Sequence, residues 1–263
     1  MGLSIDNINY KNMLNDISYR FNRARITGIY GNNANLILDI INGDNDDYDG
    51  EIIFEKVPVN KGFYMHNPTS IALIETYPFF YSTKVEDEFK FNLTFRKCDV
   101  EDIENKEKKV LKLVGLEEDI IKRDINTLST SDKYLLSIAI NLIYEPEIIL
   151  FKDIFSGLDH VSKKRITTLI NNLKEDKKII IVTSRDTNIL YELTDEVILL
   201  NGSKIYKDGT TDKLFTSVEL MKDGVIPMPN ITKVTYLAKT NKKAKLSYHK
   251  DVRDIIKDIY KHV

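Results

Sequence analysis

The sequence of 263 residues has little cysteine, little net charge and no long hydrophobic run. Its single cysteine, Cys98, excludes an internal disulfide framework and is typical of a reducing compartment. A formal net charge of −2 disfavours a dedicated nucleic-acid-binding protein, which is usually clearly basic. No apolar run reaches the roughly 18 residues that a membrane-spanning helix needs. The first residues lack a basic segment followed by an apolar one, so we expect no signal peptide and a cytoplasmic location.

The sequence does contain a regular alternation of apolar strands and amphipathic helices. Such an alternation predicts βαβ units and a mostly parallel sheet in an α/β fold. We expect strands at residues 26–30, 51–54, 70–75, 147–151, 178–183 and 196–200, and helices at 36–41, 85–91, 103–114, 135–143, 161–173, 188–193 and 251–260.

The loops that follow the parallel strands are the expected place for function. Ligands on open α/β sheets bind outside the carboxyl ends of the strands. In this sequence the loops there are residues 31–36, 75–78, 152–156 and 184–187.

Two segments in the second half of the chain carry a family pattern. Residues 128–139 begin Leu-Ser-Thr-Ser-Asp and continue into an apolar helix, and residues 147–159 form an apolar strand followed by Ile-Phe-Ser-Gly-Leu-Asp. Together they resemble the signature helix, Walker B strand and D-loop of ABC-transporter nucleotide-binding domains. The framework residues that match this pattern are Leu128, Ser129, Ala139, Pro146, Gly157, Leu158 and Asp159.

The end of the chain narrows the resemblance. Residues 202–209, 213–215 and 227–238 are similar to the tail of energy-coupling-factor ATPases. In that family two ATPase subunits dimerise partly through this tail. They drive a transmembrane coupling subunit and a subunit that binds a vitamin or a metal.

The resemblance implies the fold class and the domains. We expect a P-loop NTPase-like ABC ATPase domain with a mostly parallel sheet, an antiparallel N-terminal β part and a helical signature subdomain at about residues 84–145. The domain is expected to span residues 1–217. Residues 218–263 would form a small C-terminal appendage of the dimerisation type.

The expected phosphate loop lacks its usual chemistry. A working loop reads G-x-x-x-x-G-K-[ST], in which the Lys binds phosphate and the Ser or Thr holds Mg²⁺. Here residues 31–38 contain no Lys, Ser or Thr, and the chain has 11 glycines, about 4% against about 7% in average proteins. Counting back from Gly43 gives a loop about three residues too short. The positions that the resemblance assigns to this loop are Gly31, Asn32, Asn33, Ala34 and Asn35, with Tyr10 at the adenine-stacking position.

The other catalytic positions are also changed. The resemblance places Lys152 at the Walker B Asp, Asp153 at the catalytic Glu and Arg185 at the switch His, with Glu75 in the Q-loop. A Lys repels Mg²⁺, so it either binds phosphate itself or pairs with Asp153 or Asp186. Arg185 either binds phosphate bidentately or forms a surface ion pair.

The positions that face a partner's nucleotide are better preserved. In the family the signature loop and the D-loop close over the ATP of the other subunit, which assigns Ser129, Thr130, Ser131 and Asp159 to a partner's site. The alternative for Ser129 or Thr130 is a cap on the following helix. The aromatic residues that follow Glu75 lie either in the core or in a partner groove; they are Tyr77, Phe79, Phe80 and Tyr81.

Three functions follow from these residues. The first is a degenerate ATPase subunit that pairs with a competent one and couples dimer closure to a membrane subunit, on the cytoplasmic face of the membrane. The second is a weak transport ATPase that uses Asp153 and Arg185, and the third is a scaffold or regulator with no role in transport.

The resemblance also implies the cofactors. The family binds ATP and Mg²⁺, but the residues missing here disfavour their binding by this chain alone. The four His residues have no metal-binding spacing, and we expect no nucleic-acid partner.

Overall fold

A computed structural model describes residues 2–98, 101–241 and 246–262 of the chain. It contains a six-stranded sheet in the order β10-β9-β3-β8-β7-β6 and a four-stranded sheet in the order β2-β1-β4-β5. Strands β9, β3, β8, β7 and β6 run parallel, whereas β10 and the whole smaller sheet are antiparallel. The predicted α/β fold with an antiparallel N-terminal β part is thereby confirmed.

The elements follow one another in the chain with short connections. The strands are β1 (Gly2–Tyr10), β2 (Leu14–Asn22), β3 (Arg25–Tyr30), β4 (Asp49–Phe54), β5 (Val57–Pro58), β6 (Ile71–Glu75), β7 (Ile148–Lys152), β8 (Ile179–Thr183), β9 (Glu196–Asn201) and β10 (Lys204–Thr210). The helices are α1 (Ala34–Asn42), α2 (Lys61–His66), α3 (Val85–Phe95), α4 (Ile103–Val114), η1 (Glu118–Lys122), η2 (Ile125–Thr127), α5 (Thr130–Leu142), α6 (His160–Glu175), α7 (Thr187–Leu193), α8 (Thr211–Phe215), α9 (Val218–Asp223), α10 (Asn230–Asn241) and α11 (Val252–His262).

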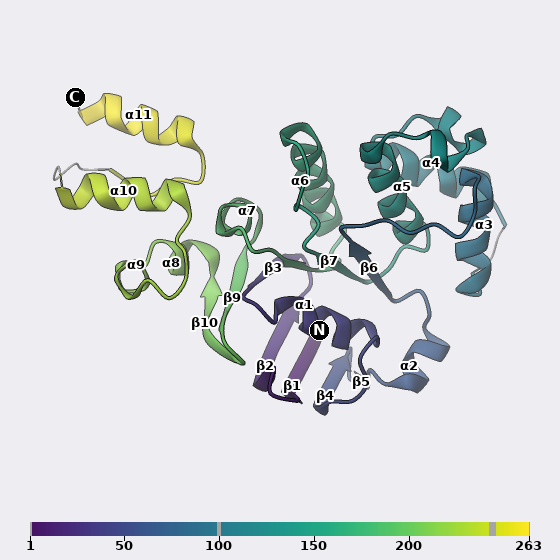
Figure 1. Cartoon of the computed structure of the whole chain (residues 1–263), viewed down its shortest axis with the longest axis horizontal. Helices are drawn as coiled ribbons and strands as arrows, with labels where there is room; N and C mark the ends of the chain where they lie inside the picture. Colours follow the sequence, from purple (N-terminus) through teal and green to yellow (C-terminus); the bar gives the residue numbers. More distant parts are fainter. Residues whose placement is uncertain (1, 99–100, 242–245, 263) are drawn as a thin grey trace.

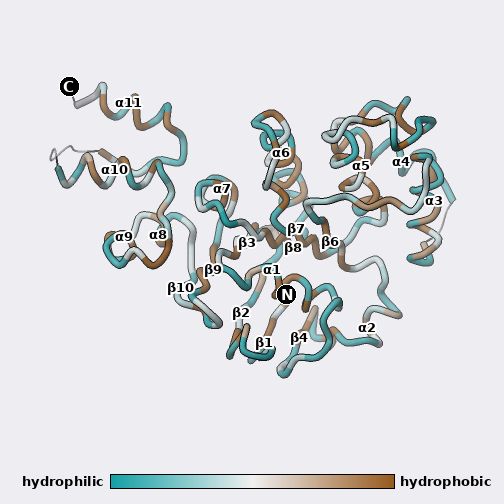
Figure 2. The backbone as a smooth tube through the Cα atoms, viewed as in Figure 1, coloured by the Kyte–Doolittle hydropathy of each residue, from teal (hydrophilic) through white to brown (hydrophobic). Residues whose placement is uncertain are grey.

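Strand β7 shows why the large sheet is buried on both faces. Its side chains alternate: Ile148 and Leu150 pack with α1 and the smaller sheet, and Ile149 and Phe151 pack with α3 to α6. Helix α1 lies between the two sheets, and α6 covers the opposite face of the large one (Figure 1). Hydrophobic residues concentrate on these central strands in Figure 2. The continuous apolar run predicted this double burial.

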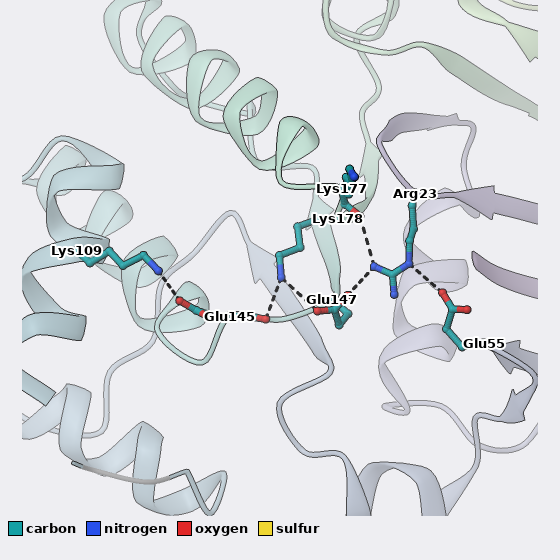
Figure 3. A network of polar contacts seen from close by, with 7 residues as sticks. All are labelled: Arg23, Glu55, Lys109, Glu145, Glu147, Lys177 and Lys178. Carbon is teal, nitrogen blue, oxygen red and sulfur yellow. Dashed lines mark hydrogen bonds and ion pairs between the residues drawn. The ribbon is translucent and has the colours of Figure 1, made fainter. Parts of the chain in front are cut away.

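Charged side chains join the layers at the amino ends of the strands. The Arg23 guanidinium binds Glu55 at 2.9 Å and Glu147 at 2.5 Å, and Lys178 reaches Glu147 at 3.4 Å (Figure 3). The same network continues to Glu145, which accepts from Lys178 through its backbone carbonyl. These contacts tie the smaller sheet to β7 and β8 at the edge opposite the expected site.

The chain after β10 is mostly helical. Leu220 on α9 and the following Ile226 pack with Phe215 and with α7 and β9, so this segment shares a core with the main body. Helices α10 and α11 lie beyond it at one end of the molecule (Figure 1). The proposed boundary at residue 217 stays a prediction. None of the described helices combines the length and the apolarity that crossing a bilayer requires.

Candidate functional site

The connection between β3 and α1 is a tight three-residue turn, Gly31 to Asn33. Gly31 has a φ of +135°, and a Cβ there would lie 2.7 Å from the Leu200 Cβ, so the backbone presses against the end of β9. The Asn33 amide nitrogen donates to the carbonyl oxygens of Met13, at 2.5 Å, and Gly202, at 3.3 Å. These contacts hold the turn against its neighbours, and Asn32 is left exposed.

The first turn of α1 points its side chains into the protein. Ala34, which the resemblance assigns to the position of the phosphate-binding Lys, is 3% exposed, and Ile37 and Leu38 are buried in the core. The Asn35 carbonyl oxygen accepts a hydrogen bond of 2.6 Å from the Thr183 hydroxyl. The Thr183 oxygen in turn accepts from the backbone N–H of Asp153 at 3.0 Å. The ends of β7 and β8 are thus bound directly to α1.

Lys152 forms an ion triad at the end of β7. Its ammonium lies 2.7 Å from the Asp39 carboxylate on α1 and 2.9 Å from the Glu75 carboxylate at the end of β6. Although burial alone would lower the pKa of Lys152, these two hydrogen bonds raise it. The expectation of a structural ion pair is confirmed, but the expected partners, Asp153 and Asp186, are wrong. Asp39 was missed because no motif connects a residue on α1 with one 113 positions later.

Asp153 and Arg185 are neighbours that interact through their charges and through a backbone hydrogen bond. The Asp153 carboxylate accepts a hydrogen bond from the backbone N–H of Arg185, while burial raises the pKa of Asp153. Asp153 also has a φ of +51°, which is uncommon for a residue with a side chain. The Arg185 side chain is exposed and forms no ion pair with any residue that the structure describes, so the surface ion pair is not observed. Its guanidinium is exposed to solvent, where it can meet an anion, and it acts on Asp153 through its charge.

Tyr10 belongs to the core around the smaller sheet. Its side chain is 9% exposed, and the Lys11 ammonium lies 4.8 Å from the centre of the ring. A base that stacked on this ring would have to displace Lys11. The packed aromatic, rather than an open stacking surface, is what the structure contains.

The signature loop is a helix cap. Ser129 is the N-cap of α5, where its hydroxyl oxygen accepts from the backbone N–H of Asp132 at 3.1 Å and donates to the Asp132 carboxylate at 2.8 Å. Thr130 is exposed and Ser131 is half-buried. Ser129 therefore caps α5, as the alternative interpretation predicted, and the edge of the loop is exposed to solvent.

The D-loop residue Asp159 has the same arrangement. It caps α6 by accepting from the backbone N–H of Ser162 at 2.9 Å and from the Ser162 hydroxyl at 2.8 Å. These bonds, the backbone bond first, lower the pKa of Asp159, so the carboxylate is charged at neutral pH. It is exposed, and so its charge is available to a partner.

An aromatic surface lies next to Glu75. It consists of Tyr77, Phe79, Tyr81, Phe91 and Phe95. Phe79 and Tyr81 stack edge to face at 5.0 Å between ring centres, Tyr81 lies 4.7 Å from Phe91, and Phe91 lies 6.1 Å from Phe95. All five side chains are exposed, Tyr77 and Phe95 by three quarters or more. Phe80, by contrast, packs against the core.

The groups at the β3–α1 turn do not fit Mg²⁺-ATP. Mg²⁺ needs oxygen ligands in octahedral geometry. At this turn the Asn35 oxygen is bonded to Thr183, and the Lys152 ammonium occupies the end of the Walker B strand. No cluster of three or more His, Cys, Asp or Glu among the described residues could hold a metal ion.

The sheet, the helical insertion α3 to α5 and the turn into α1 define the fold of the ABC ATPases. The family model described as ABC transporter matches residues 14–156, more than half of the chain, and the chain belongs to this family. The resemblance to the ABC-transporter nucleotide-binding domains is thereby confirmed.

Individual relatives agree with this family. The energy-coupling factor transporter ATP-binding protein EcfA3 of Oenococcus oeni is 26% identical over 233 residues, covering 82% of this chain and 78% of its own. EcfA2 of Mycoplasmopsis synoviae is 30% identical over 155 residues, 59% of this chain and 50% of its own. The solved structure of cbiO1 from Clostridium perfringens, part of the ABC transporter complex cbiONQ, aligns with a TM-score of 0.74 and 22% identity, covering 89% of this chain and 98% of its own.

Proposed function

We propose that this chain is an ATPase-family subunit of an energy-coupling-factor-type transporter that does not hold ATP in its own site. It pairs with a second ATPase subunit, whose nucleotide it covers with Ser129, Thr130, Ser131 and Asp159. Dimer closure is then passed to a membrane subunit. The proposal draws its support from the energy-coupling relatives and from the geometry of the two loops.

The Lys152 ion triad is the observation that carries this proposal. A Mg²⁺ ion at the end of β7 would have to displace an ammonium that two carboxylates already neutralise. As long as the Lys152 ammonium stays between Asp39 and Glu75, its positive charge repels a metal ion. If the ammonium moved away, the two carboxylates would lose their cation. The covalently attached charge of Lys152 therefore lies where the family binds a Mg²⁺ ion.

Direct binding of ATP to the purified chain tests the empty site. We expect no binding up to millimolar ATP, with or without Mg²⁺, by isothermal titration calorimetry. Addition of a competent partner subunit should produce one bound ATP per pair. Micromolar binding by the isolated chain, with turnover that is lost in Asp153→Asn, would replace this proposal by the weak ATPase, in which Arg185 supplies the missing charge.

The aromatic surface is the proposed contact with the membrane subunit. Five exposed aromatic side chains are an unusual concentration for a solvated face, and aromatic residues are enriched at protein interfaces. Glu75 joins this surface to the Lys152 triad, so the docking segment is tied to the same strand ends that frame the site.

A double charge substitution tests this contact. Phe79→Asp with Tyr81→Asp should release the chain from membranes that contain the transporter, without loss of stability, because both side chains are exposed. Met13→Asp, at an exposed position in the turn between β1 and β2, is the matched control and should leave membrane recovery unchanged. Equal recovery of both variants would exclude the aromatic surface as the contact.

The tail is the proposed second contact with the partner ATPase. Helices α10 and α11 expose the apolar side chains of Val234, Leu237, Ile256 and Ile259. The similarity of this region to energy-coupling-factor tails, which dimerise, supports the assignment. Removal of these side chains should weaken pairing without an effect on the isolated chain.

A further inference from the structure

A cavity of about 590 Å³ lies in the helical subdomain, away from the strand ends. Its walls come from α3, α4 and η1, which contribute five carboxylates and three ammonium groups. Its size is in the range of small-molecule sites in proteins. Nothing in the proposed function uses it.

Glu107 is the unusual residue of this cavity. It is 4% exposed, and its Oε1 atom is buried and has no hydrogen-bond partner within the part of the chain that the structure describes. A buried carboxylate oxygen without a partner is costly, so native proteins pair such atoms. Burial, with further contributions from Glu104 and Glu86, raises the pKa of Glu107, although Lys90 opposes the shift.

The surroundings of Glu107 favour a positively charged ligand. Of the other carboxylates in the wall, Glu118 pairs with Lys108 at 3.9 Å and Asp119 pairs with Arg123. Glu86 and Glu104 form no ion pair with any described residue, and both lie close enough to Glu107 to affect its titration. Among the described residues, these three carboxylates form no ion pair at close range, although the Lys90 ammonium acts on Glu107 from a longer distance.

A metal ion does not fit this requirement, because no three carboxylates among the described residues approach closely enough to coordinate one. The wall also contains the half-buried side chains of Ile103 and Ile121, which belong to the edge of the large core. An apolar wall beside unpaired carboxylates suits a ligand with a cationic head and a hydrocarbon stem.

We propose that this cavity binds an alkylammonium group, with the ammonium at Glu107 and the alkyl chain against Ile103 and Ile121. Glu104 and Glu86 add attraction at longer range. Lys90, on the facing helix α3, competes with the ligand for Glu107. A free amine and the side chain of a lysine in another protein share this chemistry.

Two probes test the site on the purified full-length chain. n-Pentylamine represents a free amine, and Nα-acetyl-lysine methylamide represents a protein lysine; 1-pentanol has the same stem as the amine without the charge. We expect saturable binding of at least one of the two amines in isothermal titration calorimetry and none of 1-pentanol. Preferential binding of the lysine derivative would identify a protein segment as the source.

Substitutions then locate the binding. Glu107→Gln keeps the shape of the side chain and removes its charge, and should weaken amine binding at least about tenfold. Lys90→Met removes the competing ammonium and should strengthen binding. Asp87→Asn changes an exposed carboxylate at the start of α3 outside the cavity wall, and should leave binding unchanged.

The proposal is overturned if neither amine binds, if 1-pentanol binds as well as n-pentylamine, or if Glu107→Gln binds as tightly as the natural chain. Melting temperatures separate these outcomes from unfolding. The Glu107→Gln variant should melt no lower than the natural chain, since it loses a buried unpaired charge. None of these measurements involves ATP, so the result is independent of the proposed function.

Discussion

The turn before α1 and the loop before α5 both end at a helix N-terminus and both use polar side chains for internal hydrogen bonds, but they differ in how far they are exposed. The side chains of Asn33 and Asn35 form hydrogen bonds within the protein. Asn33 donates to two backbone carbonyl oxygens, and Asn35 accepts from the Thr183 hydroxyl. Ser129 and Thr130 leave the edge of their loop exposed. The first region is closed by internal contacts and the second is open to a partner. This difference in exposure favours contacts with a partner at the loop before α5 over ligand binding at the turn before α1.

The strongest way to break the closed region is Lys152→Met. The substitution leaves the Asp39 carboxylate, 19% exposed, without its cation and next to Glu75. We expect a loss of about 2–3 kcal/mol in the free energy of unfolding, less than the roughly 3–5 of a fully buried pair. Urea denaturation measures it. Lys109→Met, which removes an exposed pair with Glu145, is the control and should cost less than about 0.5 kcal/mol. Adding Asp39→Asn to Lys152→Met should restore part of the lost stability. If Lys152→Met alone leaves the free energy of unfolding unchanged, the triad does not stabilise the fold.

Gly31→Ala tests the close approach of the turn to β9. A Cβ would meet that of Leu200 at 2.7 Å with φ at +135°, so we expect a loss of about 2 kcal/mol in unfolding free energy. Gly157→Ala has a positive φ but no atom within 4 Å of its Cβ, and should cost about 1 kcal/mol. Equal losses in the two variants would mean that the turn is not pressed against its neighbour.

Ser129→Asp separates the two roles of the open region. Asp is as good an N-cap as Ser, but it loses the hydrogen bond that the Ser129 hydroxyl donates to the Asp132 carboxylate and sets a second carboxylate beside it, so we expect a loss of about 1 kcal/mol in the free energy of unfolding. Its carboxylate would also repel the phosphates of a partner's ATP. We expect the ATPase activity of the assembled complex to fall about tenfold, equivalent to about 1.4 kcal/mol. If activity stays the same while the complex assembles, Ser129 is a cap and nothing more.

The smallest expected effect is that of Ala34→Lys with Asn35→Ser, which restores two residues of the phosphate-loop pattern. ATP binding should stay weaker than millimolar, because the turn is still three residues long and the position of Ala34 is buried. A calorimetric titration of the variant beside the natural chain measures it. Micromolar affinity would show that side-chain chemistry, and not loop length, had closed the site.

The sequence predicted the parts of the fold that depend on local pattern. The apolar runs around β7 and β8 and the amphipathic pattern of α4 and α6 placed these elements to within one or two residues. Helix α3 extends four residues beyond its predicted end, because Leu93 is the one buried residue among the four that were added and it does not by itself form a periodic pattern. Helix α2 and strand β5 were not expected, since they are short and largely exposed. Strand β10 was not expected because none of its residues is buried and it has no apolar run.

The sequence predicted where the site residues lie, but not which side chains they contact. The motif order placed Lys152, Asp153 and Arg185 at neighbouring strand ends, as the structure has them. It could not indicate Asp39, whose contact with Lys152 exists because α1 packs beneath β7. For Glu107 a signal was present: it lies on the helical face of Ile103, Val110, Leu111 and Val114, where an acidic residue is out of place.

The Lys152 triad also bears on how this chain can change over evolutionary time. Lys152→Asp alone, which would place the family's acidic residue at this strand end, would set a third carboxylate beside Asp39 and Glu75 with no cation among them. A longer turn alone would have to displace the contact of Gly31 with Leu200. We expect each of these single changes to give a less stable protein, so the triad and the turn would have to change together before this site could hold a metal ion beside a longer loop.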